Sequence, residues 1–458
     1  MLNIRSLTKL SGLIAASLLT GIASQVHATT LLEIYDRAAQ NDPQIRAADA
    51  NRLATREAHP QAWAQLLPNI SANANWSSVA CSANSAACAA VGFPTGPQPT
   101  DAYTKRGGSF SLDAEERINL PLMLRNLKHT DYVLAQADIT YHAAEQDLAV
   151  RVANAYFNVL SAQDVLTSSQ ASLAAFNKQL EQQEKRFEVG LSANTDVQEA
   201  RAARDAASAT VISSKQALAS AQEQLRVIAG TFVDKLAAPV DDMPLIMPEP
   251  QNEEDWVKKA LDGNLNLAAA RVSLDMATYD LGTTKTYRYP SLTLGASYNN
   301  NKTFNDFDTS NGIHSWNGTI VSVGISVPLF SGGMISSQIR QSTYLQRAAR
   351  ENVELATRQT DSGARNAFLG MESAIALVKA NKQAYESAKL ALQATEAGFD
   401  VGTRTTIDVL NSRKALLTAE VQYEQSRYQY ITQLITLKQT SGELSRADLE
   451  LINSWLTK

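Results

Sequence analysis

The feature that most constrains this chain is an internal repeat, in which residues 187–230 align with residues 399–442 at a constant offset of 212 and without a gap. The matched pairs include Asp196 with Asp408, Val197 with Val409, Arg201 with Arg413 and Gly230 with Gly442, and Asn154-Ala155 matches Asn366-Ala367 upstream. Self-similarity at a fixed offset indicates that one structural unit occurs twice. Whatever fold one half adopts, the other half must therefore adopt as well.

Each copy opens with two segments in which apolar and polar residues alternate, and the first segment of each follows a proline, Pro68 or Pro290. The apolar positions are Ile70, Ala72, Ala74 and Trp76, then Phe110, Leu112, Ile118 and Leu120, then Leu292, Leu294, Ala296 and Tyr298, then Val321, Val323, Ile325 and Val327. Glu116 is a misfit on the apolar side of the second segment. Alternation predicts four strands. Strands of about ten residues with one polar face are typical of a membrane barrel with a wet lumen; a soluble sandwich is the alternative.

Four strands cannot close a barrel by themselves, because the smallest barrels need about eight. An open sheet edge is not tolerated in lipid either, since its backbone groups would lack hydrogen-bond partners. Several chains must therefore pool their strands. Two, three or four copies would each give an even number of strands, and the alternation does not choose among them.

The rest of each copy carries apolar residues at intervals of seven. The positions are Val152, Val159, Leu166, Leu173, Leu180 and Phe187 in the first copy, and Met371, Val378, Tyr385, Leu392 and Phe399 in the second. A heptad repeat predicts coiled-coil packing. A continuous helix from about residue 124 to residue 189 would be on the order of 90 to 100 Å long. Such a rod must pack on a returning helix and on copies in neighbouring chains.

Both long helices are predicted to end at a glycine, Gly190 or Gly402, which a threonine and an aspartate follow within a few residues. Glycine adopts the left-handed conformation that closes a helix, and an aspartate near the start of the next helix favours its N-terminus. These two glycines therefore mark the tips of two helical hairpins.

The repeat also divides the chain. Arg5 and Lys9 precede an uncharged stretch, and Ala28 ends a small-residue cleavage site, so residues 1–28 are predicted to be a signal peptide. Residues 29–230 form the first copy, with a helix, two strands, a long helix and a returning helix. Residues 231–252 are a linker and residues 253–442 are the second copy. We expect the C-terminal segment 443–458 to join the short helices of both copies in a belt around the rod.

Composition argues against several functions. The net charge is −5 and the isoelectric point is about 5.7, which gives no basic surface for nucleic acid. The five histidines have no metal-ligand spacing, and Gly332-Gly333 lacks the lysine of a phosphate-binding loop. We therefore predict no enzyme, no cofactor and no metal site. The only cysteines, Cys81 and Cys88, are either a local disulfide or two unpaired thiols in a loop.

Three passages resemble a known family closely: Val327 to Gly333 (VPLFSGG), Phe399 to Leu410 (FDVGTRTTIDVL) and Phe187 to Val197 (FEVGLSANTDV). With them, nearly the whole mature chain is similar to the TolC-type outer-membrane efflux and secretion channels. The resemblance implies a homotrimer, a twelve-stranded barrel in outer-membrane lipid and a helical tunnel that reaches into the periplasm. It also implies two partners, a periplasmic adaptor protein and an inner-membrane pump or secretion ATPase.

The resemblance also implies roles for residues at the two tips. The gate maps to Thr195 and Asp196 on the first tip and to Arg404 on the second. Phe399 stands where the family has a tyrosine, so its hydroxyl is missing. Our hypothesis is that Arg404 pairs with Asp196, within or across protomers. Helix capping and a solvated charge are the alternative interpretation of these two residues.

At the mouth of the tunnel, the resemblance places the constriction at Asp408 and Asn411. Because Asn411 replaces a second aspartate, one ring of carboxylates is expected there instead of two. From the sequence alone, Asp408 is only an aspartate in the first turn of a helix. The adaptor is expected to dock beside Gly190 and Gly402.

The sequence thus predicts a passive duct that its partners gate. A standalone diffusion porin and a structural scaffold anchored by a barrel are the alternatives. The long hairpins argue against a simple porin, and the polar inner strand faces argue against a filled barrel. Drugs, metals, peptides and proteins all remain open as substrates.

Overall fold

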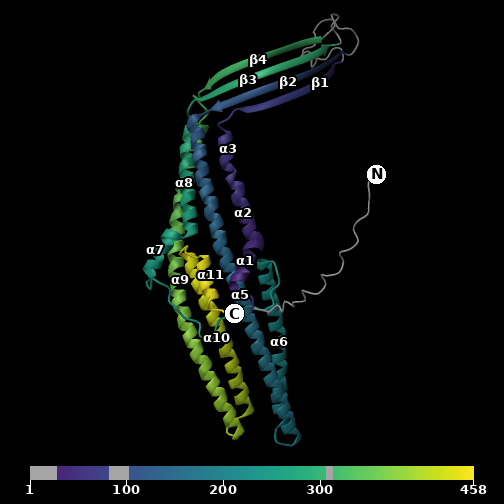
Figure 1. Cartoon of the computed structure of the whole chain (residues 1–458), viewed down its shortest axis with the longest axis vertical. Coiled ribbons are helices and arrows are strands. Elements are labelled where there is room, and N and C mark those ends of the chain that lie inside the picture. The colour runs from purple at the N-terminus through teal and green to yellow at the C-terminus, as the bar shows by residue number, and fades with distance from the viewer. Residues whose placement is uncertain (1–27, 82–102, 306–312, 458) are drawn as a thin grey trace, which may run out of the picture.

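The computed structural model describes residues 28–81, 103–305 and 313–457, which form a long rod with a sheet at one end and two helical hairpins at the other (Figure 1). The first copy comprises α1 (Leu31–Asn41), α2 (Pro43–Arg56), α3 (Ala58–Ala64), β1 (Asn69–Cys81), β2 (Tyr103–Ile118), α5 (Leu120–Glu188) and α6 (Asn194–Ala229). The second comprises α7 (Glu253–Gly263), α8 (Leu265–Thr286), β3 (Ser291–Asn305), β4 (Ile313–Ser326), α9 (Met334–Asp400) and α10 (Thr406–Thr440), and α11 (Arg446–Asn453) follows. The predicted signal peptide lies outside the described residues, apart from Ala28. The possible disulfide does as well, because Cys88 is outside the described residues and the side chain of Cys81 is not described.

The four strands form one antiparallel sheet in the order β1-β2-β3-β4. In the half of the sheet nearer the helices, its register keeps one face apolar apart from Glu116, because Ile70 lies opposite Ala114, Ala114 opposite Ala296 and Ala296 opposite Val321. The adjacent row is polar or glycine and consists of Asn69, Glu115, Gly295 and Ser322. The two faces that the alternation predicted are therefore present. Within the described part of one chain, β1 and β4 each leave one edge unpaired.

The long helices α5 and α9 have 69 and 67 residues, so each is about 100 Å long. Asn119 caps the start of α5 by accepting a hydrogen bond from the backbone N–H of Leu122 (3.3 Å). Each long helix packs on its returning helix, α5 on α6 and α9 on α10. Toward the sheet, α8 lies against both α5 and α9. No helix among the described residues is both long and apolar enough to cross a bilayer.

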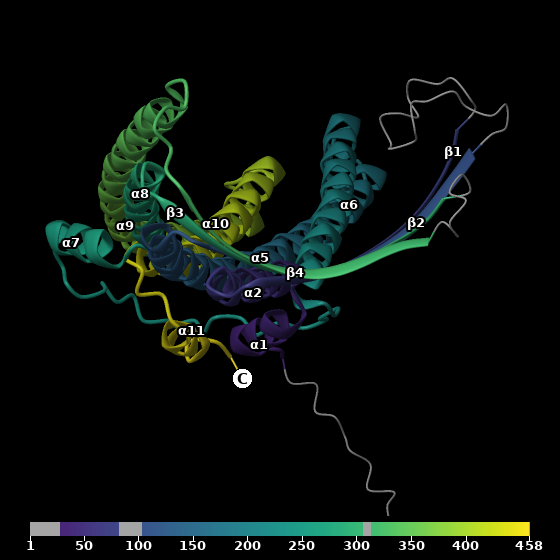
Figure 2. The same cartoon turned by 90° about the horizontal axis from the view of Figure 1, so that it is seen from above.

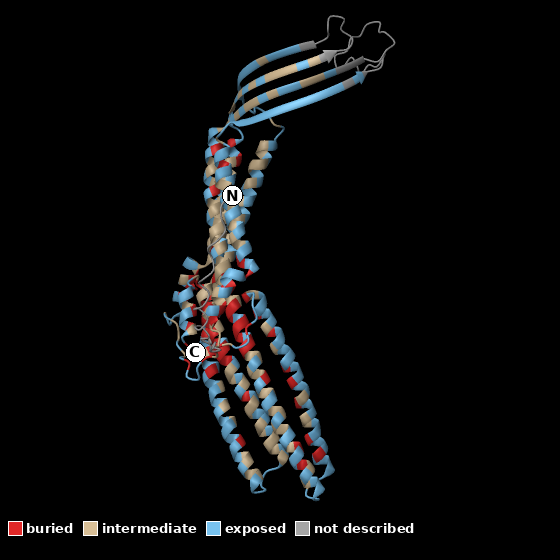
Figure 3. Cartoon of the chain, turned by 45° about the vertical axis from the view of Figure 1, so that its right-hand side comes forward, coloured by how far each residue is buried: buried red, intermediate tan, exposed pale blue. Residues whose placement is uncertain are grey.

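Most of the core lies midway along the rod. Figure 3 shows buried residues concentrated there, whereas the sheet and much of the hairpins are exposed. The heptad residues Val152, Met371 and Tyr430 are fully buried, and Val159 and Val378 nearly so. Apolar heptad positions therefore do face neighbouring helices. Apolar surface is left exposed toward both ends of the rod, which indicates that other chains or lipid cover it.

The short helices differ from the single helix expected at the start of each copy, because the chain breaks at Asp42 and at Asn264. Pro43 has no backbone N–H to continue α1, and the Asp42 side chain accepts from the backbone N–H of Gln44 (3.0 Å) to start α2. Asn264 accepts from the backbone N–H of Leu267 (3.1 Å) and so starts α8. Viewed from above, α1, α7 and α11 lie together on one side of the long helices (Figure 2).

The linker between the copies is held against α5 and α10 by buried side chains of these two helices. Tyr156 donates to the Ala237 carbonyl (2.6 Å), Arg427 donates to the carbonyls of Pro239 (3.1 Å) and Val240, and Tyr430 accepts from the Ile246 N–H (2.8 Å). The chain ends join it, because Thr29 bridges to Leu236 and Leu456 bridges to Pro239. Residues 231–252 are thus a strap fixed to the helices on the outside of the rod.

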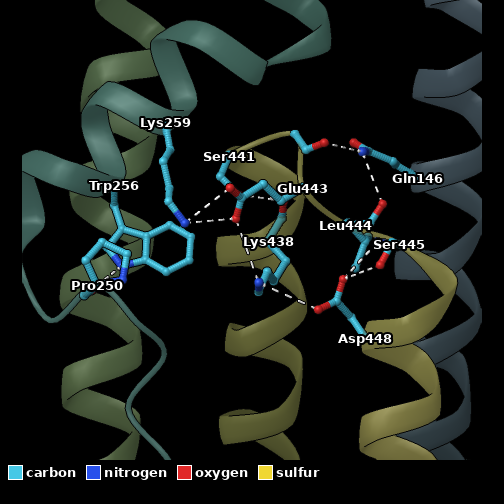
Figure 4. Close-up of polar contacts among 11 residues, drawn as sticks. Gln146, Pro250, Trp256, Lys259, Lys438, Ser441, Glu443, Leu444, Ser445 and Asp448 are labelled. Carbon is cyan, nitrogen blue, oxygen red and sulfur yellow. Dashed lines mark hydrogen bonds and ion pairs between the residues drawn. The ribbon is translucent and has the colours of Figure 1, made fainter.

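A second group of polar contacts joins α7 to the C-terminal end of α10 and to α11 (Figure 4). The Glu443 carboxylate lies 3.2 Å from the Lys259 ammonium and 3.8 Å from that of Lys438, which also lies 3.7 Å from Asp448. Both ammonium groups lie near the ring of the buried Trp256, at 4.8 and 5.8 Å from its centre. The short helices are therefore fixed in place around the middle of the rod.

Replacing Arg427 with leucine should strongly destabilise the protein. The Arg427 side chain is 3% exposed and pairs with Glu424, which is 25% exposed. Its removal leaves Glu424 and two linker carbonyls without their donor, at a cost of about 3 to 5 kcal/mol. Arg358→Leu is the matched control, because the pair of Arg358 with Glu354 is 76% and 57% exposed and contributes about 1 kcal/mol or less. Chemical denaturation of the detergent-solubilised protein, followed by circular dichroism, measures the free energy of unfolding of both variants. Equal losses of stability would contradict the conclusion that Arg427 fixes the linker to the helices.

Candidate functional site: the hairpin tips

Both hairpin tips turn at a glycine in the left-handed region, with φ of 75° at Gly190 and 79° at Gly402. The Gly190 N–H donates to the Phe187 carbonyl (2.9 Å), and the Gly402 N–H donates to the Phe399 carbonyl (3.0 Å). The left-handed conformation favours glycine. No atom lies within 4 Å of where a Cβ would stand at either residue. The tips therefore present bare, exposed backbone.

Asp408 caps the second hairpin's returning helix. Its carboxylate accepts from the backbone N–H and from the hydroxyl of Thr405, both at 2.8 Å, while its own N–H donates to the Thr405 hydroxyl (3.3 Å). This reciprocal arrangement is a capping box. The hydrogen bonds from Thr405, with a smaller contribution from the positive charge of Arg404, lower the pKa of Asp408 below its ordinary value. The carboxylate is therefore held in its charged form.

Asp196 has the same place in the first hairpin and also turns back to cap its helix. Its carboxylate accepts from the Ser192 hydroxyl (2.8 Å) and the Ala193 N–H (3.3 Å). Among the described ion pairs of one protomer, none joins Asp196 to Arg404. The Asp196 carboxylate is engaged at its own helix end. The pair of Arg404 with Asp196, within or across protomers, stays a prediction.

Each hairpin carries its own ion pair near the tip instead. Arg201 donates to Glu184 (3.1 Å) across the first hairpin, and Arg413 donates to Glu396 across the second. The two pairs are related by the same offset of 212 as the sequence repeat. Their side chains are 40 to 47% exposed, so each pair contributes only about 0.2 to 1 kcal/mol. The pairs therefore hold each hairpin to itself.

Two further contacts join the hairpins to each other. The Gln183 amide nitrogen donates to the Thr406 hydroxyl (2.7 Å), and the Arg186 guanidinium lies 5.8 Å from the centre of the Phe399 ring. Gln183, Arg186 and Thr406 were not among the residues that the sequence singled out. Each differs in type from its counterpart in the other copy, but so do neighbours such as Lys185 and Leu191, so the sequence carries no specific signal for them.

The remaining predicted residues are exposed. Thr195 lies in the first turn of α6, next to Asp196. Asn411 lies three residues after Asp408 on α10, which puts both side chains on one helix face. Asn411 also lines a hollow of about 530 Å³ between α5, α6 and α10. Asp408 and Asn411 thus lie on one face of α10, and their part in a constriction stays a prediction.

Comparison with known proteins agrees with this architecture. Residues 34–231 and 256–443 match the family model described as outer membrane efflux protein, so both copies are matched and the strap lies mostly in the gap. The chain is 35% identical over 452 residues to the outer membrane protein TolC of Vibrio cholerae, with 98% of each chain covered. It is 33% identical to TolC of Escherichia coli, with 96% of this chain and 87% of the relative covered.

A more distant relative is the alkaline protease secretion protein AprF of Pseudomonas aeruginosa, at 27% identity over 92% of this chain and 86% of the relative. Among solved structures, the Vibrio cholerae outer membrane protein VceC superposes with a TM-score of 0.69 at 19% identity, covering 90% of this chain and 96% of that one. The Campylobacter jejuni outer membrane channel CmeC superposes with a TM-score of 0.71 at 15% identity, covering 93% and 89%.

These structures share the fold described above. Four strands from each of three chains close a twelve-stranded barrel in the outer membrane, and the long hairpins continue it as a helical barrel in the periplasm. The matches cover both copies and nearly the full length of the chain. This chain therefore belongs to the outer membrane efflux protein family, the TolC-type channels.

Proposed function

We propose that a trimer of this chain is the outer-membrane exit duct of a tripartite efflux pump or a type I secretion system. The observation that carries this proposal is the direct continuation of a two-faced sheet into helices about 100 Å long. The sheet leads into α5 through Asn119 and into α9 through residues 327–333. A diffusion porin has no use for such hairpins, and a scaffold has no use for a polar inner face.

The sheet supports a water-filled passage. With its apolar face toward lipid, the row of Asn69, Glu115, Gly295 and Ser322 faces the lumen. Three chains pair the free edge of each β4 with the free edge of the next β1, so that no backbone group is left unpaired in lipid. Conduction is passive, and the chain carries out no catalysis.

The tips support a gate. Arg404 lies exposed on the second tip and Asp196 on the first, so a pair between neighbouring protomers is compatible with the exposure of both residues. Thr195 and Phe399 belong to the same gate. Three exposed pairs would bias a symmetric gate by only about 1 to 3 kcal/mol. Docking of a partner that binds the open tip better than the closed one can overcome a bias of that size.

The same geometry supports the proposed partners. Gly190 and Gly402 carry no side chain and nothing beyond their chain neighbours lies close to them, which leaves room for a helical hairpin of a periplasmic adaptor protein. An inner-membrane pump or secretion ATPase would deliver the substrate. Relatives are named for protease secretion and for cobalt, zinc and cadmium resistance. Because their cargoes differ, we assign the choice of substrate to the pump and not to this chain.

Arg404→Ser should raise the conductance of the purified trimer in a planar bilayer. The native channel should conduct weakly, because Arg404 holds the tips together, and the variant should conduct clearly more. Arg358→Ser is the control, since this exposed arginine pairs with Glu354 in the half of α9 nearer the sheet. Equal, high conductance in all three proteins would contradict the gate and favour a porin. A verified trimer that never conducts would favour the scaffold.

Asp408→Asn should weaken the preference of the mouth for cations, and Asn411→Asp should strengthen it. The first change removes the expected ring of carboxylates, and the second adds another ring on the same helix face. Because the hydrogen bonds from Thr405 lower the pKa of Asp408, the native preference should persist as pH falls through the ordinary range of aspartate and vanish only below it. Reversal potentials in a salt gradient measure this; an unchanged potential in both variants would place the selectivity elsewhere.

A further inference from the structure

The internal repeat separates two kinds of contact at the tips. Contacts that occur in both copies lie within a hairpin, as in the pairs of Glu184 with Arg201 and of Glu396 with Arg413. Such contacts build the common unit. Contacts that join one hairpin to the other are not part of the repeated unit, and they instead fix the position of one copy relative to the other.

Several positions at the tips differ between the two copies, and three of them make contacts with the other hairpin. Gln183 corresponds to Thr395, Arg186 corresponds to Gly398, and Thr406 corresponds to Asn194. Thr395 hydrogen-bonds Ser412 inside its own hairpin (3.1 Å). The longer Gln183 side chain reaches out of its hairpin to Thr406 in the other one, over a sequence separation of 223 residues. The contacts that join the hairpins therefore involve residues that the repeat does not duplicate.

The geometry around Gln183 is that of a satisfied, buried polar group. Its side chain is only 3% exposed. The amide nitrogen donates to the Thr406 hydroxyl (2.7 Å), and the amide oxygen accepts from the Ser192 hydroxyl (3.0 Å). One neutral side chain thus ties together α5, the first tip and the start of α10. Leaving a buried amide without its partners is costly, so the link favours the arrangement in which the hairpins are close.

A second contact supports the same arrangement. Arg186 lies one helical turn after Gln183 in α5, and its guanidinium faces the ring of Phe399 at the end of α9. A cation near an aromatic face is attracted to it whether or not the ring carries a hydroxyl. Phe399 can therefore take part in holding the tips closed although it lacks the tyrosine hydroxyl. Gln183 and Arg186 act on the two helices of the same neighbouring hairpin.

We propose that the bridge from Gln183 to Thr406 is a latch within each protomer, which holds its two hairpins together in the closed tip and breaks when the tip opens. The inference rests on the proposed function as a gated duct. Widening the tip requires the hairpins to separate or tilt, and a hydrogen bond of 2.7 Å is lost after a displacement of less than about 1 Å. Because both partners are neutral, the latch works independently of pH between the titration ranges of the nearby charged groups.

The test compares single-channel recordings of the purified full-length trimer in planar bilayers for the native protein, two single variants, their double variant, one conservative variant and one control. Gln183→Met keeps the length of the side chain and removes the amide, and Thr406→Val keeps the shape and removes the hydroxyl. Thr406→Ser is the conservative variant, because serine keeps a hydroxyl at this position. Thr395→Val is the matched control, because it removes a hydrogen bond of the same kind inside one hairpin.

Loss of one neutral hydrogen bond changes an equilibrium by about 2-fold to 10-fold, so the loss of three together should raise the ratio of open to closed time by about 10-fold or more. Gln183→Met and Thr406→Val should each show this rise, and the double variant should show no more than either one. Thr406→Ser should behave like the native channel, as should Thr395→Val. The rise should be the same at low and high salt, unlike that of Arg404→Ser.

Two outcomes would overturn the latch while leaving the duct intact: conducting channels whose open time is unchanged by Gln183→Met and Thr406→Val, or additive effects in the double variant. A verified trimer that conducts in no variant would instead overturn the proposed function itself. If Thr406→Val fails to assemble, Gln183→Met compared with native and Thr395→Val decides the question by the same measurement.

Discussion

The rest of the structure depends on the need to pair every backbone group of a sheet that lies in lipid. A single chain supplies four strands and leaves the outer edges of β1 and β4 free. Lipid offers no hydrogen bonds to these edges, so closure requires neighbouring chains. Once three chains close the barrel, the helices that continue the strands are placed in a ring as well. The position of both hairpin tips around one axis is thus a consequence of strand pairing far away.

Long helices bring a second requirement, because a helix of about 100 Å has too much surface for one chain to cover. The buried residues gather where α1, α7, α11 and the strap of residues 231–252 surround the long helices. There the side chains of Tyr156, Arg427 and Tyr430 bind the backbone of the strap. The middle of the rod is therefore the firmly packed part. Toward the tips buried residues become fewer, which suits the moving part of the gate that we propose.

The tips combine symmetric and asymmetric contacts. Capping by Asp196 and Asp408 and the ion pairs of Arg201 and Arg413 occur in both copies, and each holds a hairpin in shape. The contact of Gln183 with the other hairpin occurs once. Individually these interactions are weak. For the gate that we propose, a few weak contacts in each of three protomers would keep the tip shut and still let a docking partner open it.

The sequence by itself determined the local elements. Alternation predicted the four strands and their two faces, heptads predicted helices that α5 and α9 realise, and Gly190 and Gly402 marked the turns, since each of these patterns records the geometry of neighbouring residues. Only the tertiary structure decided that Gln183 reaches Thr406 and that the linker is a fixed strap. Such contacts depend on the distance and register between separate helices. A periodic pattern records which face of a helix is buried and not which residue lies opposite it.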